Sequence, residues 1–494
     1  MGWHSGRMTQ KIRTVDATAR QKPVSRPPGP VRRWWGLSWL RALRLDYLGF
    51  VQSLQRAHGD ISYMQILWEH AYDLHSPDMV RAALVDNAAG VIRWERGIEV
   101  LSQSVGQSLL TTEGDVWQRQ RRMLQPGFAP RRVAGYTRLM ASAASQALDA
   151  AMPAHVDQAL VNVDALMTGL TMDVIMRTLF SQAAAKDTQD AARAVQILSR
   201  TGLREMFNPA TLPDWLPLPD KADKRWALRT LRDLIHQKIL ERQQLLVNAP
   251  ESAPRDDLLA MLLSARDDNP GEVTGNSSVG LSPAELQDQC NVMFQAGHET
   301  SATALLWWCR LMAEHPEAAS KASDEIQRVL AGRSPMPEDL PQLEWLSATL
   351  KESMRLYPPV PALMSRRTQQ AMQLGEWRVP KGSLLRITPW VLHHDARWFP
   401  NPEAFQPERF CKGAASIPRG AYMPFGTGPR VCVGQHFATM EMTLIAAMLL
   451  QRYALQLPEG KGVMPRGVMG VTLRPDAAIN LIFVRRNQVA AVSI

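Results

Sequence analysis

The sequence predicts a mainly α-helical protein with a small β region, and three observations lead to this class. The 494 residues are 45% hydrophobic and 21% charged, so the chain can bury a large core. Apolar residues recur at helical spacing over most of residues 112–315. Alternating strand patterns are confined to a short segment after residue 60 and to the chain beyond residue 358.

The beginning of the chain predicts a tail followed by a helix. Residues 1–30 are polar and basic, and their end is rich in proline, which disfavours a helix and favours an extended strap. Residues 40–58 carry apolar side chains close to a 3.6-residue period, as expected of a core helix, while their aromatic and arginine content leaves open contact with a membrane surface. Since no later segment has the composition of an interdomain linker, we expect residues 31–494 to form a single domain.

The later elements are mostly helices separated by two loops. Residues 61–77 predict a pair of short strands before a helix at 78–84. The helical stretch is broken at 208–220, which holds four prolines, and at the polar, glycine-rich segment 265–282. The remaining elements are expected in this order: a long helix from Ser282, shorter helices to about Tyr357, a helix from about Val433 and terminal strands.

Composition and charge exclude several classes of protein. Lysine and arginine outnumber aspartate and glutamate by 56 to 47, but this excess is spread along the chain and predicts no nucleic-acid-binding arm. Four cysteines at irregular spacing match neither a disulfide scaffold nor a zinc site, which favours the reducing cytoplasm. No run approaches the roughly 20 apolar residues of a membrane span, so we expect no transmembrane segment.

One cysteine is distinguished by its surroundings. The run from Pro424 to Gly434 reads PFGTGPRVCVG and leads directly into a helix. Gly426 and Gly428 permit backbone angles closed to other residues. Cys432 lies at the start of the helix, where free N–H groups stabilise a thiolate. A single thiolate on such a loop suits an axial haem ligand better than zinc, which takes four donors.

This loop resembles the haem-binding pattern F-G-x-G-x-R-x-C-x-G of the cytochrome P450 family, and the similarity extends over roughly residues 30–490. The resemblance implies the family's triangular, mostly α fold, with haem b between an oxygen-binding helix and the helix after the cysteine loop. It implies that Cys432 ligates the iron and that Arg430 contacts a haem propionate, with Phe425 and Gly434 at other fixed positions. Residues 31–494 would then be one P450 catalytic domain of the soluble bacterial type.

Further motifs of the family occur in the expected order. Trp117 and Arg121 match a W-x-x-x-R motif whose members bind the second propionate. Arg366, slightly preferred over Arg367, is expected to be another propionate partner, since buried carboxylates need several fixed donors. In the family, an E-x-x-R pair and a later arginine form a buried structural triad, which corresponds here to Glu352, Arg355 and Arg409.

The long central helix carries an oxygen-handling motif. A mid-helix glycine costs about 1 kcal/mol relative to alanine, so Gly297 indicates close approach of another group. The Thr300 hydroxyl can bond back toward Ala296 and open a groove in the helix. The resemblance places Ala296 and Gly297 against the haem. It also makes Glu299 a proton-supplying acid and Thr300 a participant in oxygen activation. His298 is expected to be a packed or solvent-linked side chain, not an iron ligand.

The resemblance implies a haem-thiolate monooxygenase. Such an enzyme would insert one atom of O2 into a lipophilic small molecule, such as a fatty acyl or terpenoid compound. Electrons from NAD(P)H would arrive indirectly, through a separate ferredoxin and ferredoxin reductase. Two alternatives stay open: a peroxide-driven or rearranging member of the family, and a non-catalytic haem-binding sensor or carrier. The acid and alcohol pair argues against the first, because such relatives tend to replace it.

Contacts with substrate and partner are expected by analogy. The expected substrate residues are mostly apolar: Val100, Leu101, Trp215, Phe294, Val360, Met364 and Met469. A polar end of the substrate could be anchored by Arg93, Arg96 and Glu99. An acidic electron donor could dock on a basic face that includes Arg119, Arg122, Arg131 and Arg132.

Overall fold

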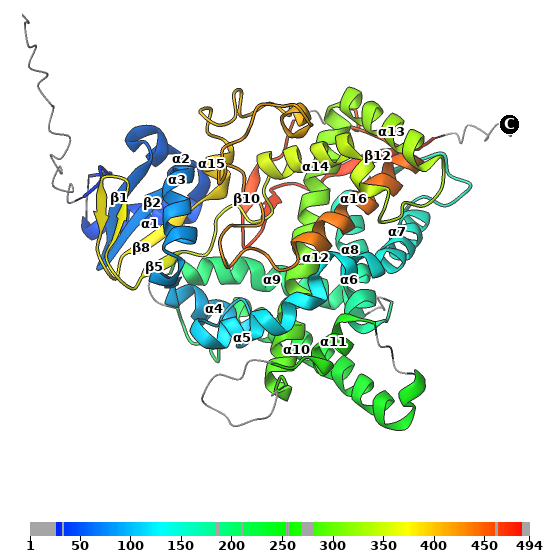
Figure 1. The fold of residues 1–494 in the computed structure, drawn as a ribbon, viewed down its shortest axis with the longest axis horizontal. Helices are drawn as coiled ribbons and strands as arrows, with labels where there is room; N and C mark the ends of the chain where they lie inside the picture. Colours follow the sequence, from blue (N-terminus) through cyan, green and yellow to red (C-terminus); the bar gives the residue numbers. More distant parts are fainter. Residues whose placement is uncertain are drawn as a thin grey trace, which may run out of the picture.

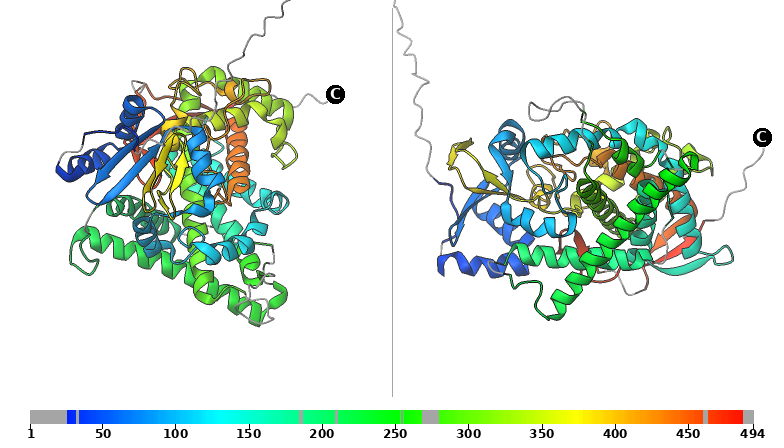
Figure 2. Two further views of the ribbon diagram at one scale, coloured as in Figure 1. Left: turned by 60° about the vertical axis from the view of Figure 1, so that its left-hand side comes forward. Right: turned by 90° about the horizontal axis from the view of Figure 1, so that it is seen from below.

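The computed structural model describes residues 26–31, 34–183, 187–208, 211–252, 254, 256–267, 280–459 and 463–486. A five-stranded sheet and the first helices lie at one end of the molecule, and the other helices fill most of the rest (Figure 1, Figure 2). The predicted mainly α class with a small β region is therefore confirmed. Most of the predicted tail lies outside the described residues, so its boundary at residue 30 stays a prediction.

The five-stranded sheet combines two distant parts of the chain. Its strand order is β1 (Ile61–Ile66), β2 (Glu69–Leu74), β8 (Leu384–Ile387), β5 (Arg366–Thr368) and β3 (Val91–Arg93). The predicted strand pair is confirmed as β1 and β2, which run antiparallel with Ile61 opposite Leu74. The sequence pattern does not predict β3, because three residues carry too little alternation. This strand forms through its pairing with β5.

The helix predicted at 40–58 is two helices, α1 (Leu37–Leu45) and α2 (Tyr47–His58). Asp46 separates them, because its backbone angles are not helical and its carboxylate caps α2 by accepting the Gly49 N–H at 2.9 Å. The helix predicted at 78–84 is α3 (Pro77–Arg81), which continues as a π-helical turn at Ala82–Asp86.

The remaining helices form the body of the molecule. They are α4 (Glu95–Val105), α5 (Gly114–Leu124), α6 (Pro130–Gly135), α7 (Thr137–Ala151), α8 (Val163–Phe180), α9 (Asp187–Met206), α10 (Pro219–Asn248), α11 (Leu258–Ser264), α12 (Pro283–Glu314), α13 (Pro316–Leu330), α14 (Glu344–Leu356), α15 (Pro389–His393) and α16 (Gln435–Arg452). Short 3-10 turns occur at Trp34–Gly36, Ala88–Gly90, Gln125–Phe128, Pro250–Ser252, Leu340–Gln342 and Pro407–Phe410. The first predicted break is confirmed by the described residues between α9 and α10, whereas most of the second, residues 268–279, lies outside the described residues.

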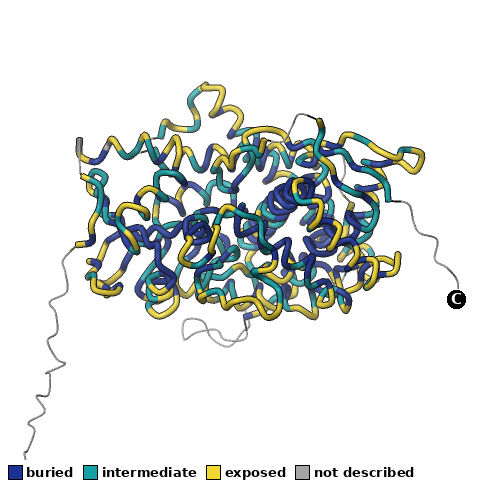
Figure 3. Tube along the Cα trace, turned by 90° about the horizontal axis from the view of Figure 1, so that it is seen from above, coloured by how far each residue is buried: buried dark blue, intermediate teal, exposed yellow. Residues whose placement is uncertain are grey.

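The central helix is α12. It begins as predicted, with Ser282 as its N-cap and Pro283 as its first residue. The Glu285 N–H donates to Ser282 Oγ at 3.2 Å, and the Ser282 N–H donates to Glu285 Oε2 at 2.9 Å, which completes a capping box. Its 32 residues span about 48 Å. It packs against α8, α14 and α16 and runs through the buried interior of the molecule (Figure 3).

Short strands complete the fold. A three-stranded sheet has the order β4 (Gln158–Asn162), β12 (Asn480–Arg485) and β9 (Tyr453–Gln456), and two hairpins are β6–β7 (Met372–Leu374, Trp377–Val379) and β10–β11 (Gly467–Met469, Leu473–Pro475). The terminal strands confirm the prediction, whereas β4 is a second short strand that the sequence pattern does not predict. Among the described residues, no helix is both long and apolar enough to cross a membrane.

Candidate active site

The loop before α16 fixes the position of Cys432. The Cys432 N–H donates to the Phe425 carbonyl at 3.0 Å. Gly426 and Gly428 have φ angles of 75° and 76°, in the left-handed region that disfavours other residues. A side chain at Gly428 would also clash with the Leu84 carbonyl. The prediction that both glycines adopt angles closed to other residues is therefore confirmed.

The Cys432 side chain is exposed. The surrounding protein nevertheless raises the pKa of its thiol by desolvation, and this effect outweighs the Gly434 N–H and the charge of Arg121, which both lower it. The predicted stabilisation of a thiolate is therefore present, through the Gly434 N–H and Arg121, but it is smaller than the effect of desolvation, so the pKa of the Cys432 thiol is raised overall. A metal cation would reverse the balance, because a coordinating thiol loses its proton.

Four arginines gather beside this loop, and three of them interact with the carboxylate of Glu113. Arg93 and Arg366 lie directly opposite each other on β3 and β5, and both are buried. Arg430 forms an ion pair with Glu113, and its guanidinium lies 4.1 Å from the centre of the Trp117 ring. Arg93 lies 3.7 Å from the same carboxylate. The fourth member is Arg121, which donates to the Val431 carbonyl at 2.9 Å.

The arginine cluster carries an excess of buried positive charge. Burial lowers the pKa of Arg366 to about 10, and the charge of Arg430 adds to this effect. Burial, Arg430 and Arg366 lower the pKa of Arg93 in the same direction. Like charges directly opposite on neighbouring strands are unfavourable, and Glu113 supplies a single negative charge. Two haem carboxylates would neutralise this excess, so the residues present fit the cofactor.

The adjacent arginines at 366 and 367 have different partners. Arg367 binds Glu69 at 2.7 Å and Glu95 at 3.0 Å, whereas Arg366 belongs to the arginine cluster. The geometry therefore favours Arg366, as expected. It also moves Arg93 from the expected substrate anchor to this cluster. Arg93 is assigned to the cluster by its position opposite Arg366 in the sheet, and this pairing cannot be predicted from the sequence alone.

The turn of α12 that carries the oxygen-handling motif is open on one side. Ala296 is exposed and Thr300 is half-buried, although most of α12 is buried. The Thr300 hydroxyl donates to the Ala296 carbonyl at 2.8 Å, as expected. A Cβ at Gly297 would lie 2.8 Å from Ile175 of α8, so this glycine permits close helix packing. The exposure of Ala296 leaves room for a flat group over this turn.

The two residues before Thr300 are buried. Glu299 accepts a hydrogen bond from the Thr472 hydroxyl at 2.9 Å and lies 3.8 Å from Arg474. Burial raises the pKa of Glu299, and the charge of Arg474 opposes this rise. His298 Nδ1 lies 2.9 Å from the Phe294 carbonyl, and burial lowers the pKa of His298 to about 4. His298 is therefore a packed, neutral side chain at pH 7, as expected.

The structure brings the expected structural triad together. Arg355 donates to the two carboxylate oxygens of Glu352 at 2.7 and 2.8 Å, and neither side chain is exposed to solvent. Arg409 donates to Glu352 at 3.3 Å. The other N–H groups of Arg355 donate to three carbonyls at the end of α15 and in the segment after it: His393 at 2.8 Å, Pro402 at 2.7 Å and Ala404 at 3.1 Å. The triad therefore fixes the irregular chain that leads to the cysteine loop.

A second buried acid, Glu441 of α16, is not singled out by the sequence motifs. It is 1% exposed and accepts a hydrogen bond at 2.6 Å from the hydroxyl of Ser301, the residue after Thr300. Burial raises the pKa of Glu441 to about 8. The sequence could have indicated this residue, because Glu441 lies in the mostly apolar run of α16 and a buried carboxyl group requires a hydrogen-bond partner.

Several expected substrate residues converge around α4. Val100 of α4 lies 3.7 Å from the position that a Cβ of Gly202 in α9 would occupy, and Met364 lies 3.2 Å from that of Gly97 in α4. Met469 packs beside the group of buried side chains that contains Leu473. Two further members of the set are half-buried: Leu101 and Val360.

Two other expected substrate residues lie in different surroundings. Trp215 is 75% exposed. Its loop is held by Arg225, which donates to the carbonyls of Asp214 and Leu216, so the backbone turns inward and the Trp215 side chain turns outward. Phe294 is fully buried. It lies about 200° around α12 from Ala296, because each residue turns the helix by about 100°, and so it belongs to the core.

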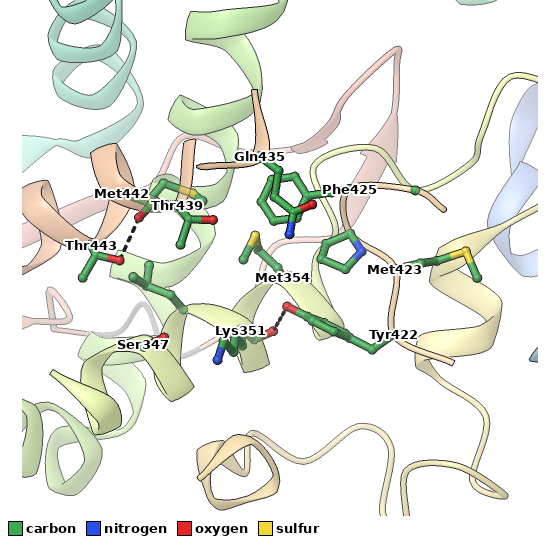
Figure 4. A pocket seen from close by; sticks show the side chains of 13 residues that line it. Ser347, Lys351, Met354, Tyr422, Met423, Phe425, Gln435, Thr439, Met442 and Thr443 are labelled. Carbon is green, nitrogen blue, oxygen red and sulfur yellow. Dashed lines mark hydrogen bonds between the residues drawn. The ribbon is translucent and has the colours of Figure 1, made fainter. Parts of the chain in front are cut away.

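A pocket of about 260 Å³ lies beside the cysteine loop (Figure 4). It is lined by α14, by the loop before Cys432 and by α16: Ser347, Leu350, Lys351, Met354, Tyr422, Met423, Pro424, Phe425, Gly426, Gln435, Thr439, Met442 and Thr443. Two of the lining residues are linked to each other, since the Tyr422 hydroxyl donates to the Lys351 carbonyl at 3.0 Å. None of these residues belongs to the expected substrate set, so this pocket is separate from the region around α4.

Comparison with known proteins identifies the family. The family model described as Cytochrome P450 matches residues 27–481. A cyclooctat-9-en-7-ol 5-monooxygenase from Streptomyces melanosporofaciens is 33% identical over 422 residues, which are 85% of this chain and 86% of the relative. A cyclooctatin synthase from the same organism is 32% identical over 436 residues, 87% and 90% of the two chains. An 11-oxo-beta-amyrin 30-oxidase from Glycyrrhiza uralensis is 30% identical over 391 residues, 77% and 73% of the two chains.

The fold and these matches define a haem-dependent oxidoreductase. The chain belongs to the cytochrome P450 family and is a cytochrome P450 monooxygenase. This assignment confirms the resemblance that the cysteine loop indicates and the fold class that accompanies it.

The buried acid Glu441 predicts a pH-dependent stability. Because folding raises its pKa from 4.5 to about 8, the folded state retains the proton more strongly, and the free energy of unfolding should fall as pH rises from about 4.5 to 8. The Glu441→Gln variant should lack this fall and gain up to about 5 kcal/mol relative to wild type across that range. Denaturant unfolding of the haem-loaded protein at several pH values measures it. The exposed Glu376→Gln variant is the control, and an equal pH slope in all three proteins would contradict the prediction.

The arginine pair predicts unequal effects on haem retention. Arg366→Met should release haem about 10- to 100-fold faster than wild type, because a charge-assisted hydrogen bond to a carboxylate is worth about 1.5–3 kcal/mol. Arg367→Met should release haem at nearly the wild-type rate, since its partners are Glu69 and Glu95. Transfer of haem to an excess of apomyoglobin measures both rates. Faster release from the Arg367 variant would reverse the assignment.

Proposed function

We propose that this P450 hydroxylates a terpenoid or similarly lipophilic molecule with electrons delivered by a separate ferredoxin and ferredoxin reductase. One observation carries the proposal. Cys432, on the loop before α16, and Ala296, on the otherwise mostly buried helix α12, both have exposed side chains, and an arginine cluster with excess positive charge lies beside the cysteine loop. A planar, dianionic cofactor with an iron centre would cover the exposed side chains, neutralise the charge and ligate the thiol.

Each residue of the site has a distinct part in this proposal. When bound, haem supplies the iron at which O2 is activated, so that one oxygen atom enters the substrate and the other leaves as water. Cys432 Sγ would ligate the iron. Thr300, whose hydroxyl is held at the open turn of α12, would hold water or a proton beside the haem. Glu299, buried next to it, would supply that proton. The carboxylates of the haem would be held by the arginine cluster: Arg93, Arg121, Arg366 and Arg430.

A terpenoid substrate is supported by two observations. The side chains that converge near α4, such as Val100 and Met364, are apolar, so recognition would depend mainly on buried hydrocarbon area. The names of three relatives refer to cyclooctat-9-en-7-ol, cyclooctatin and 11-oxo-beta-amyrin. Arg96 is committed to Glu99 at 2.8 Å and to the Glu205 carbonyl at 3.1 Å, which argues against its role as a substrate anchor.

The electron donor and the location are further parts of the proposal. All four cysteines are free, which fits the reducing cytoplasm. Two arginines of the expected docking face are already ion-paired: Arg119 with Glu285 at 2.6 Å and Arg122 with Asp267 at 3.1 Å. Arg132 also pairs with an acid, Asp256 at 3.8 Å, so the exposed Arg131 is the better candidate for contact with an acidic ferredoxin.

Reconstitution with isotope-labelled O2 tests the function. Ferredoxin, its reductase, NAD(P)H and a panel of terpenoid alcohols that shift the haem spectrum should yield a product with one labelled oxygen. Product formed with hydrogen peroxide but not with the redox proteins would favour the peroxide-driven alternative. Tight binding of a ligand that is never converted, with either oxidant, would favour a sensor or carrier.

The Thr300 hydroxyl predicts coupling between electron use and product. Thr300→Ala should retain haem and NAD(P)H oxidation but lose at least about tenfold in product formed per NAD(P)H, with hydrogen peroxide as the main product. Thr178→Ala is the matched control, because the Thr178 hydroxyl makes the same bond to its own helix at 2.8 Å, away from this turn. Equal coupling in both variants would contradict the role of Thr300.

A further inference from the structure

The carboxyl group of Glu299 is held by the β10–β11 hairpin, whose residues belong to none of the family motifs found in the sequence. Glu299 is 6% exposed, and Thr472 is 2% exposed. The Thr472 hydroxyl donates to Glu299 Oε1 at 2.9 Å, and Arg474 Nε lies 3.8 Å from the same oxygen. The other end of Arg474 binds Asp164 of α8 at 2.7 Å. The carboxyl is thus enclosed by side chains from the β10–β11 turn, from β11 and from α8.

The hairpin segment that holds Glu299 is itself anchored. The Trp307 indole N–H, two turns further along α12, donates to the Leu473 carbonyl at 2.7 Å. The Leu473 N–H donates to the Pro359 carbonyl at 3.0 Å, and the Gly470 N–H donates to the Thr472 carbonyl at 2.8 Å. These backbone bonds fix Thr472 and Arg474 relative to α12. Their side chains therefore meet Glu299 in a position set by the fold.

The charged and polar groups facing Glu299 act in opposite directions. Burial raises the pKa of Glu299 most, and Asp164 raises it further. The charge of Arg474 and hydrogen bonds from the hydroxyls of Thr472 and Ser199 lower it. His298, next to Glu299, is neutral at pH 7. The protonation of this acid thus depends on residues of β11, α8 and α9.

We propose that Thr472 and Arg474 are positioning residues that hold the Glu299 carboxyl against α12 and govern its transfer of protons toward Thr300. This inference rests on the proposed function, in which Glu299 supplies protons. It also links proton supply to substrate binding. The same hairpin contains Met469, an expected substrate contact at the end of β10, and Gly470, whose Cβ position would lie 3.4 Å from the Ser199 hydroxyl oxygen of α9.

Infrared titration of Glu299 tests the inference without turnover. In the haem-loaded protein, the carboxyl band that disappears in Glu299→Gln identifies this group. Thr472→Val, which keeps the side-chain shape but removes the hydroxyl, should raise the titration midpoint by about one pH unit, and Arg474→Met should raise it further. Arg466→Met is the matched control, because Arg466 is an exposed cation next to β10. Unchanged midpoints in Thr472→Val, which leaves the ion pairs intact, would overturn the proposal.

A second measurement connects the titration to the reaction. With ferredoxin, reductase and NAD(P)H, the basic limb of the pH profile of product per NAD(P)H should move to higher pH in Thr472→Val by the same shift and stay in place in Arg466→Met. A shifted infrared midpoint with an unmoved profile would overturn the part of the proposal that concerns proton transfer. Absence of NAD(P)H-dependent turnover in wild type would instead contradict the proposed function, while the infrared result would still decide the positioning role.

Discussion

Burial of the Arg355 guanidinium is the constraint on which the site depends. A guanidinium has five N–H donors and keeps its charge in proteins, so burying it requires acceptors in fixed places. Glu352 supplies two acceptors, and three carbonyls between His393 and Ala404 supply the others. The Met423 N–H then donates to His393 Nε2 at 3.0 Å, directly before the cysteine loop. The location of Cys432 thus follows from a hydrogen-bond network that is far away in sequence.

Consecutive residues of α12 serve separate contacts. Gly297 faces α8, Glu299 faces the β10–β11 hairpin, the Thr300 hydroxyl stays at the open turn, and Ser301 binds Glu441 of α16. Since each residue turns the helix by about 100°, a run of five residues reaches every side of it. This is why a short motif can combine close packing, two buried carboxyl contacts and an open turn, and why shifting the helix by one residue would disrupt all of them.

The sequence predicts what is encoded locally and misses what depends on pairing. The cysteine loop, the capped start of α12 and the bond from Thr300 to Ala296 follow from residue type and short spacing. The strand β3 and the role of Arg93 depend on register with β5, which lies about 270 residues away. The exposure of Trp215 could not be predicted from its hydrophobicity, because hydrogen bonds from the Arg225 side chain to two backbone carbonyls decide which way its loop turns. Glu441 is overlooked because its raised pKa and its hydrogen bond depend on burial against α12, which is distant in sequence.

The pairing of Arg93 with Arg366 has a consequence for how the protein assembles. Two buried cations opposite each other disfavour the pairing of β3 with β5, and a dianion bound here would remove this repulsion. With the haem carboxylates in this place, binding of the cofactor and formation of this sheet edge would favour each other. In the haem-free chain, β3 would then be the least stable strand of this sheet.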